Sequence, residues 1–157
     1  MSNNISKPTK QLPQNLKELL KDIGENSVLF QIYIRIHDTN WKAFKNLDDS
    51  GCDIVLVNLE TNKTIKVEVK TRQSLYTTAT SSKTYGYREF AVTRNEYENF
   101  DILICLWYDY NSFFIIPQSE LKGDKNSIKI RIRKNKQGGY GENDKFLNNW
   151  EALINLL

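Results

Sequence analysis

Charged residues interrupt two stretches of this chain that otherwise have the composition of β-strands. Asp53 begins the apolar run 53–57, while Glu68 and Lys70 lie in and just after the run 65–69, where apolar and charged residues alternate. Because side chains on a strand alternate between two faces, Glu68 and Lys70 share a face, with Cα atoms roughly 6–7 Å apart. The polar turn between the runs predicts an antiparallel hairpin, and a loop with an even number of residues places Asp53 opposite Lys70. We therefore expect these three side chains to converge.

Two carboxylates and an ammonium group on one face of an apolar hairpin point to a bound ligand. Burying unpaired charges is costly, so packing alone does not explain their presence. Carboxylate oxygens are the protein ligands of hard cations such as Mg²⁺, which is commonly held by one or two carboxylates together with substrate phosphates. The pattern therefore predicts a Mg²⁺ site, with Mn²⁺ as a substitute, and places Lys70 near the same phosphate.

The motif resembles the core of the PD-(D/E)xK nuclease superfamily, to which restriction endonucleases and Holliday-junction resolvases belong. Asp53 is followed by fourteen intervening residues and then Glu68-Val69-Lys70, with hydrophobic runs on both sides. Cys52 stands where the family has its proline. The resemblance implies an α/β fold with an αβββαβ core, in which helices flank a mixed central sheet. It also implies metal-dependent hydrolysis of DNA phosphodiester bonds.

The resemblance assigns a role to each residue of the motif. Asp53 and Glu68 would hold the metal, and Lys70 would position or deprotonate the nucleophile and stabilise the developing charge. A glutamate from the leading helix often joins the site in this family, and Glu25 is the candidate here. Gln73, three residues after Lys70, is a further candidate catalytic residue, because relatives often place a polar residue near this point.

Glu25 has two interpretations. The spacing of Leu16, Leu19, Leu20 and Ile23 predicts a helix over 14–23, and Gly24 is then either a cap or a break before a second helix over about 25–36. On the second helix Glu25 lies on the core-facing side, beside the apolar stripe, which favours a place at the metal site. Alternatively, Glu25 is a first-turn acid that interacts with the helix dipole.

Composition limits the class of protein. The chain has 157 residues, of which 39% are hydrophobic, and this suits one domain over 14–157 after a flexible, polar arm at 1–13. A net charge of +3 is compatible with nucleic acid without requiring it. The two cysteines and the absence of a long apolar segment predict a cytoplasmic protein with reduced thiols and no membrane contact. His37 and two distant cysteines lack zinc-ligand spacing, and His37 is expected to interact with a helix dipole rather than act as a base.

The segment 74–87 is rich in Ser, Thr and Tyr and shows no core pattern. Long loops beside active sites are commonly functional, and the basic residues around this loop could contact phosphates. We therefore list Arg72, Lys83 and Arg88 as candidate nucleic-acid-binding residues. The alternative is an ordinary solvated loop.

The second half of the chain predicts a helical turn, three strands and a helix. Thr93 and Glu96 have the spacing of a capping box. Apolar runs then predict strands over 102–108, 113–116 and 128–133, the last with a basic face that either protects an edge or meets phosphates. Asp144 is expected to cap a final amphipathic helix that reaches Leu157.

Together these patterns predict a metal-dependent endonuclease of the restriction, intron-homing or junction-resolving type, acting on DNA. Two alternatives remain open: a nuclease of the same fold that acts on RNA, and a non-catalytic nucleic-acid-binding module. A homodimer or higher homo-oligomer is expected, because cutting two strands requires two active sites and the chain has one set of candidate residues.

Overall fold

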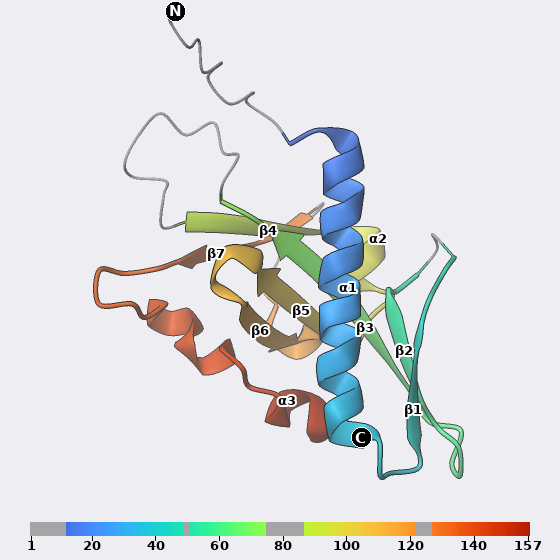
Figure 1. The fold of residues 1–157 in the computed structure, drawn as a ribbon. Helices are drawn as coiled ribbons and strands as arrows, with labels where there is room; N and C mark the ends of the chain where they lie inside the picture. The colour runs from blue at the N-terminus through green and yellow to red at the C-terminus, as the bar shows by residue number, and fades with distance from the viewer. Residues whose placement is uncertain (1–11, 49–50, 75–86, 122–126) are drawn as a thin grey trace, which may run out of the picture.

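A computed structural model describes residues 12–48, 51–74, 87–121 and 127–157 (Figure 1). The predicted arm therefore falls almost wholly outside the described residues, and so do Lys83 and most of the loop around it. The assignment of 14–157 to one domain stays a prediction. The main elements, in chain order, are α1 (Gln14–Ile36), β1 (Trp41–Lys45), β2 (Ile54–Asn58), β3 (Thr64–Arg72), β4 (Tyr87–Thr93), α2 (Arg94–Tyr97), β5 (Ile102–Trp107), β6 (Ser112–Pro117), β7 (Ser127–Arg133), the short 3₁₀ helix η4 (Gly141–Phe146) and α3 (Glu151–Ile154).

Five strands form the main sheet, in the order β1-β2-β3-β5-β6. The central pair β3 and β5 is parallel, and the other neighbours are antiparallel, so the sheet is mixed. Strands β4 and β7 pair separately as a two-stranded antiparallel sheet. This arrangement confirms the predicted mixed α/β fold, with β4 as an addition between the hairpin and the α2–β5 unit.

Two apolar layers sandwich the main sheet. On one face, Val28, Ile32 and Ile36 of α1 pack against the sheet together with Trp150 and Leu153 near α3. On the other face, the two-stranded sheet contributes a separate cluster with the side chains Phe90, Val92, Ile128 and Ile132. In Figure 1, α1 runs along the sheet in front of β3. Strand β5 is buried at every residue because both its faces are covered.

The hairpin of β2 and β3 is present, but its predicted register was wrong by two residues. Ile54 lies opposite Val67, and continuing this register places Asp53 opposite Glu68 instead of Lys70. The Asn58 amide donates to the Lys63 carbonyl at 2.9 Å, so the loop is 59–62, one residue earlier than expected, and the Asn58 side chain accepts hydrogen bonds from two of its backbone amides. A shift of two residues keeps every side chain on its predicted face, so the convergence survives.

The predicted break at Gly24 was also wrong, since α1 is one helix of 23 residues. A Cβ atom at position 24 would overlap the Thr71 side chain of β3. Glycine therefore serves close packing between helix and sheet here. The apolar residues of the first turns do not all face the core, because Leu16 and Leu19 are 39% and 54% exposed.

The predicted long C-terminal helix is replaced by two short helical segments, η4 and α3. Between them, Leu147 forms an isolated bridge with Phe114 of β6, and the Asn148 amide donates to the Phe113 carbonyl at 2.7 Å. Asn148 has a positive φ of 50°, which ends the helical path. Pairing with β6 thus outweighs the amphipathic pattern.

Two other predictions for this half of the chain, the capping box and the three strands, are confirmed. Thr93 and Glu96 form both hydrogen bonds of a capping box at the start of α2. Cys52 and Cys105 are buried and free. The basic face of β7 is partly neutralised by Glu89 of β4, which pairs with Lys129 and Arg131. No helix in the described ranges is both long and apolar enough to cross a membrane.

Candidate active site

Asp53 is fixed from both sides, by β3 and by the residue that follows β1. Its amide donates to the Val67 carbonyl at 3.0 Å, and its carbonyl accepts from the Asn46 amide at 2.8 Å. The Val69 amide donates to Asp53 Oδ2 at 2.8 Å, so the side chain takes over a backbone bond of the ladder. These bonds orient the carboxylate toward Glu68, the adjacent position on β3.

Glu25 reaches the same place from α1 and is only 4% exposed. Lys21 Nζ lies 3.5 Å from Glu25 Oε1 and 3.9 Å from Asp53 Oδ1, so this lysine links the two carboxylates. Lys45 Nζ, from β1, lies 3.3 Å from Glu25 Oε2. Because Glu25 sits near the middle of α1, the interpretation as a first-turn dipole partner was wrong.

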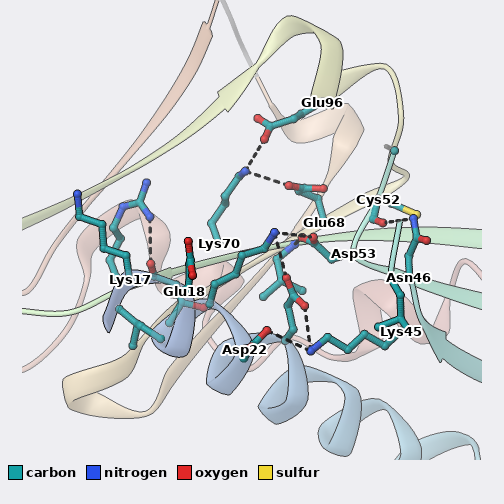
Figure 2. Close-up of a pocket in the computed structure, with 18 of the residues that line it drawn as sticks. Lys17, Glu18, Asp22, Lys45, Asn46, Cys52, Asp53, Glu68, Lys70 and Glu96 are labelled. Carbon is teal, nitrogen blue, oxygen red and sulfur yellow. Dashed lines mark hydrogen bonds and ion pairs between the residues drawn. The ribbon is translucent and has the colours of Figure 1, made fainter. Parts of the chain in front are cut away.

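Lys70 lies between two acids (Figure 2). Its Nζ is 2.9 Å from Glu68 Oε1 and 2.6 Å from Glu96 Oε1. Glu68 belongs to the same strand, while Glu96 comes from α2. The predicted group of Asp53, Glu68 and Lys70 is therefore assembled, and Glu25 joins it.

The electrostatics of the cluster follow from burial of like charges. Burial, and then repulsion from Asp53, raises the pKa of Glu68 to about 7. The same two causes, in the same order, raise the pKa of Glu25, and Lys45 and Lys21 offset this only in part. Burial opposes the charged form of Lys70, but Glu68 and Glu96 outweigh it and raise the pKa of this lysine. The negative charges of the two glutamates are thus incompletely compensated by nearby cations, whereas Lys70 is held protonated.

These side chains line one cavity of about 1350 Å³ between α1, the hairpin and α2. Basic residues also line the cavity; they are Lys17, Lys21, Lys45 and Arg72, alongside the further acids Glu18, Asp22 and Asp48. A cavity lined by both acids and basic residues can admit an anionic group together with a cation.

The other candidate residues from the sequence do not all lie at this cavity. Gln73 lines the cavity. Arg72 is exposed, and its Nε donates to the Glu89 carbonyl at 3.2 Å. Arg88 is 8% exposed; its Nε donates to the Gln73 carbonyl at 3.0 Å, and its guanidinium lies 5.8 Å from the ring of Trp107. His37 caps the far end of α1, exposed beside Asp38.

Sequence reasoning missed three residues of the cluster. Lys21 could have been found from its i,i+4 spacing to Glu25. Glu96 was predicted as a capping residue, but no sequence pattern indicates that its other carboxylate oxygen contacts Lys70. Lys45 depends on how β1 packs beside α1, which spacing alone does not reveal.

The acidic residues have the donor chemistry that hard divalent cations take in proteins. Within the part of the chain that the structure describes, no group of three or more His, Cys, Asp or Glu side chains is arranged to hold a metal ion. However, Glu25, Asp53 and Glu68 offer only oxygen donors, the two glutamates are buried, and repulsion from Asp53 raises the pKa of both. Lysines engage oxygens of all three, which shows that the cluster attracts positive charge.

Comparison of the sequence with protein families and with curated proteins gives no match. Solved structures do match. The bacterial homing endonuclease I-Ssp6803I superposes with a TM-score of 0.63 at 18% identity, over 88% of this chain and 91% of that chain. Hjc, a Holliday junction resolvase of the archaeal hyperthermophile Archaeoglobus fulgidus, superposes with a TM-score of 0.53 at 13% identity, over 83% of this chain and 93% of that one. At these identities the likeness shows the fold alone, and the chain has the restriction-endonuclease-like fold of these two structures.

Proposed function

We propose that this protein is a metal-dependent endonuclease that hydrolyses phosphodiester bonds of DNA. The observation that carries the proposal is the convergence of Glu25, Asp53 and Glu68 beside Lys70, in a cavity that basic residues also line. These three carboxylates would hold Mg²⁺, or Mn²⁺ in its place. The fold supports the same function, because the structures it resembles include a homing endonuclease and a Holliday junction resolvase.

The chemistry can be assigned to residues. When bound, the cation would supply Lewis acidity at the phosphate and lower the pKa of a coordinated water. Lys70 is held protonated by Glu68 and Glu96, so it stabilises negative charge on the phosphate and orients the nucleophile. Deprotonation of the nucleophile by this lysine stays the second proposed role. Arg72 and Gln73 line the same cavity and are proposed to contact the nucleic acid.

Cleavage assays test this function. Purified protein is incubated with DNA substrates, including linear duplex and four-way junction, and with a matched RNA duplex, with and without Mg²⁺. We expect metal-dependent cutting of DNA that Asp53→Ala and Glu68→Ala abolish while folding and DNA affinity persist. Asp38→Ala, an exposed acid at the far end of α1, is the matched control.

Each negative outcome has a meaning. Cutting of RNA alone would mean that the substrate is RNA and not DNA. Cleavage by either variant within about tenfold of the parent would remove that residue from the site. DNA binding without any cleavage would favour a non-catalytic module.

A homo-oligomer is part of the proposal. The face of α1 that points away from the sheet carries an apolar stripe in which Leu19, Phe30 and Ile34 are 54%, 65% and 50% exposed. Exposed apolar patches mark interaction surfaces, and a second copy would bring the second active site that two strands require. A cytoplasmic location is likewise proposed, supported by the two free cysteines.

A further inference from the structure

Glu96 is the one acid of the cluster that comes from α2, on the opposite side of the cavity from α1. Its Oε1 lies 2.6 Å from Lys70 Nζ, closer than Glu68 Oε1 at 2.9 Å. Its Oε2 accepts the Thr93 amide at 2.7 Å as the second half of the capping box. One carboxylate therefore joins the start of α2 to the motif lysine (Figure 2).

We propose that Glu96 is a positioning residue that holds the Lys70 ammonium group at the active site. The proposal rests on the endonuclease function given above. A lysine ends a flexible four-carbon stem, and its ammonium group takes no fixed direction without partners. The Thr93 amide fixes the Glu96 side chain, so Glu96 gives Lys70 an anchor with a defined place.

Glu68 alone cannot provide this anchor during the reaction. Its carboxylate is a proposed metal ligand, and sharing its charge with a cation weakens its attraction for Lys70. Glu96 makes its short contacts with Lys70 and Thr93 and has no ion pair with Lys21 or Lys45 among the described contacts. Its hold on Lys70 is therefore independent of metal binding.

A purely structural role for Glu96 is the competing explanation, and one substitution separates the two. Glutamine serves at this position of a capping box as well as glutamate does. Glu96→Gln therefore keeps the cap and the shape but removes the charge that binds Lys70. Glu98→Gln is the matched control, because Glu98 follows the same helix and its one ion pair among the described residues is an exposed contact with Arg94 at 3.8 Å.

The test measures four quantities on the parent, Glu96→Gln and Glu98→Gln: the single-turnover cleavage rate at saturating DNA, DNA affinity, Mg²⁺ affinity by calorimetry, and melting temperature. We expect Glu96→Gln to lower the cleavage rate by about tenfold or more, with DNA and Mg²⁺ dissociation constants within about threefold of the parent. Its melting temperature should stay close to that of the parent, and Glu98→Gln should match the parent throughout.

A readout independent of activity is the NMR signal of the Lys70 ammonium group, identified by its absence in Lys70→Met. A doubly ion-paired ammonium group exchanges its protons slowly, so the signal should be present in the parent and in Glu98→Gln and lost in Glu96→Gln. A retained signal, or a cleavage rate equal to the parent's, would overturn the positioning role. A loss of Mg²⁺ affinity by about tenfold would overturn it in favour of a metal ligand. A parent that cuts no nucleic acid would instead overturn the proposed function, and the positioning role with it.

Discussion

At the scale of single residues, the site is a set of buried acids that lysines neutralise only in part. Lys21 and Lys45 contact Glu25, and Lys70 contacts Glu68, yet the pKa of both glutamates remains raised. Desolvation explains this, because the free-energy cost of removing the carboxylates from water exceeds the attraction that the partly exposed ammonium groups provide. The protein thus carries an electrostatic cost at this place that a divalent cation would relieve.

This cost predicts an unusual pH dependence for the metal-free protein. Glu68 has a pKa of about 7 when folded, against an ordinary value of 4.5, so the folded state binds its proton more tightly than the unfolded chain does. Stability should therefore fall as the pH rises from about 4.5 to about 7. Glu68→Gln cannot ionise and should raise the melting temperature at about pH 8, with the gain vanishing near pH 4. A lower melting temperature than the parent at pH 8 would contradict this.

Glu25 gives a second prediction at this scale. Glu25→Gln keeps the shape of the side chain but removes one carboxylate from the cluster, so the cleavage rate should fall by about tenfold or more. The metal-free melting temperature should stay level or rise, because burial and Asp53 disfavour the charged form of Glu25. Glu60→Gln, at an exposed acid in the loop between β2 and β3, is the control. Full activity with reduced stability would exclude Glu25 from the site.

At the scale of elements, the sequence was most informative where a pattern repeats locally. The period of two in residues 65–69 predicted correctly which side chains share a face, although the loop around Asn58 shifted the register. The capping box of Thr93 and Glu96 was predictable for the same reason. By contrast, helix α1 continues through Gly24 because of close packing on Thr71, and the predicted C-terminal helix is interrupted at Asn148 because of pairing with Phe113. Both partners are distant in sequence, so no local pattern predicts these contacts.

Gly24 provides the test at this scale. Alanine normally stabilises a helix relative to glycine by about 1 kcal/mol. Here the added Cβ would overlap Thr71 of β3, and overpacking typically costs about 1–3 kcal/mol. We therefore expect Gly24→Ala to lower the free energy of unfolding measured by urea denaturation, and Thr71→Gly to recover part of the loss in the double variant. A more stable Gly24→Ala protein would mean that helix and sheet do not approach as described.

At the scale of the whole molecule, the apolar face of α1 is the feature that a single copy leaves unexplained. Its N-terminal part was predictable as helical from spacing, but helix α1 is apolar on two faces, and sequence alone could not decide which one packs on the sheet. The buried face carries Val28 and Ile32, while Phe30 and Ile34 point outward.

The proposed assembly can be tested on that outer face. Phe30→Glu places a charge in the apolar stripe and should lower the mass measured by light scattering toward that of a single chain. Leu59→Glu is the control, because Leu59 is similarly exposed, at 60%, but follows β2 outside the stripe. A parent that is already monomeric would contradict the proposed oligomer, and an oligomeric Phe30→Glu variant would place its interface elsewhere.

The central claim, that the buried carboxylates form a site for a divalent cation, is tested most directly by titrating Mn²⁺ into the metal-free protein. Calorimetry at about pH 7.5 should show saturable binding near one ion per chain. Asp53→Asn, which removes the charge next to Glu68 and Glu25 but keeps the side-chain shape, should weaken this binding by about tenfold or more. The exposed Asp38→Asn control should bind like the parent. Absence of saturable binding in the parent, or unchanged affinity in Asp53→Asn, would contradict the account.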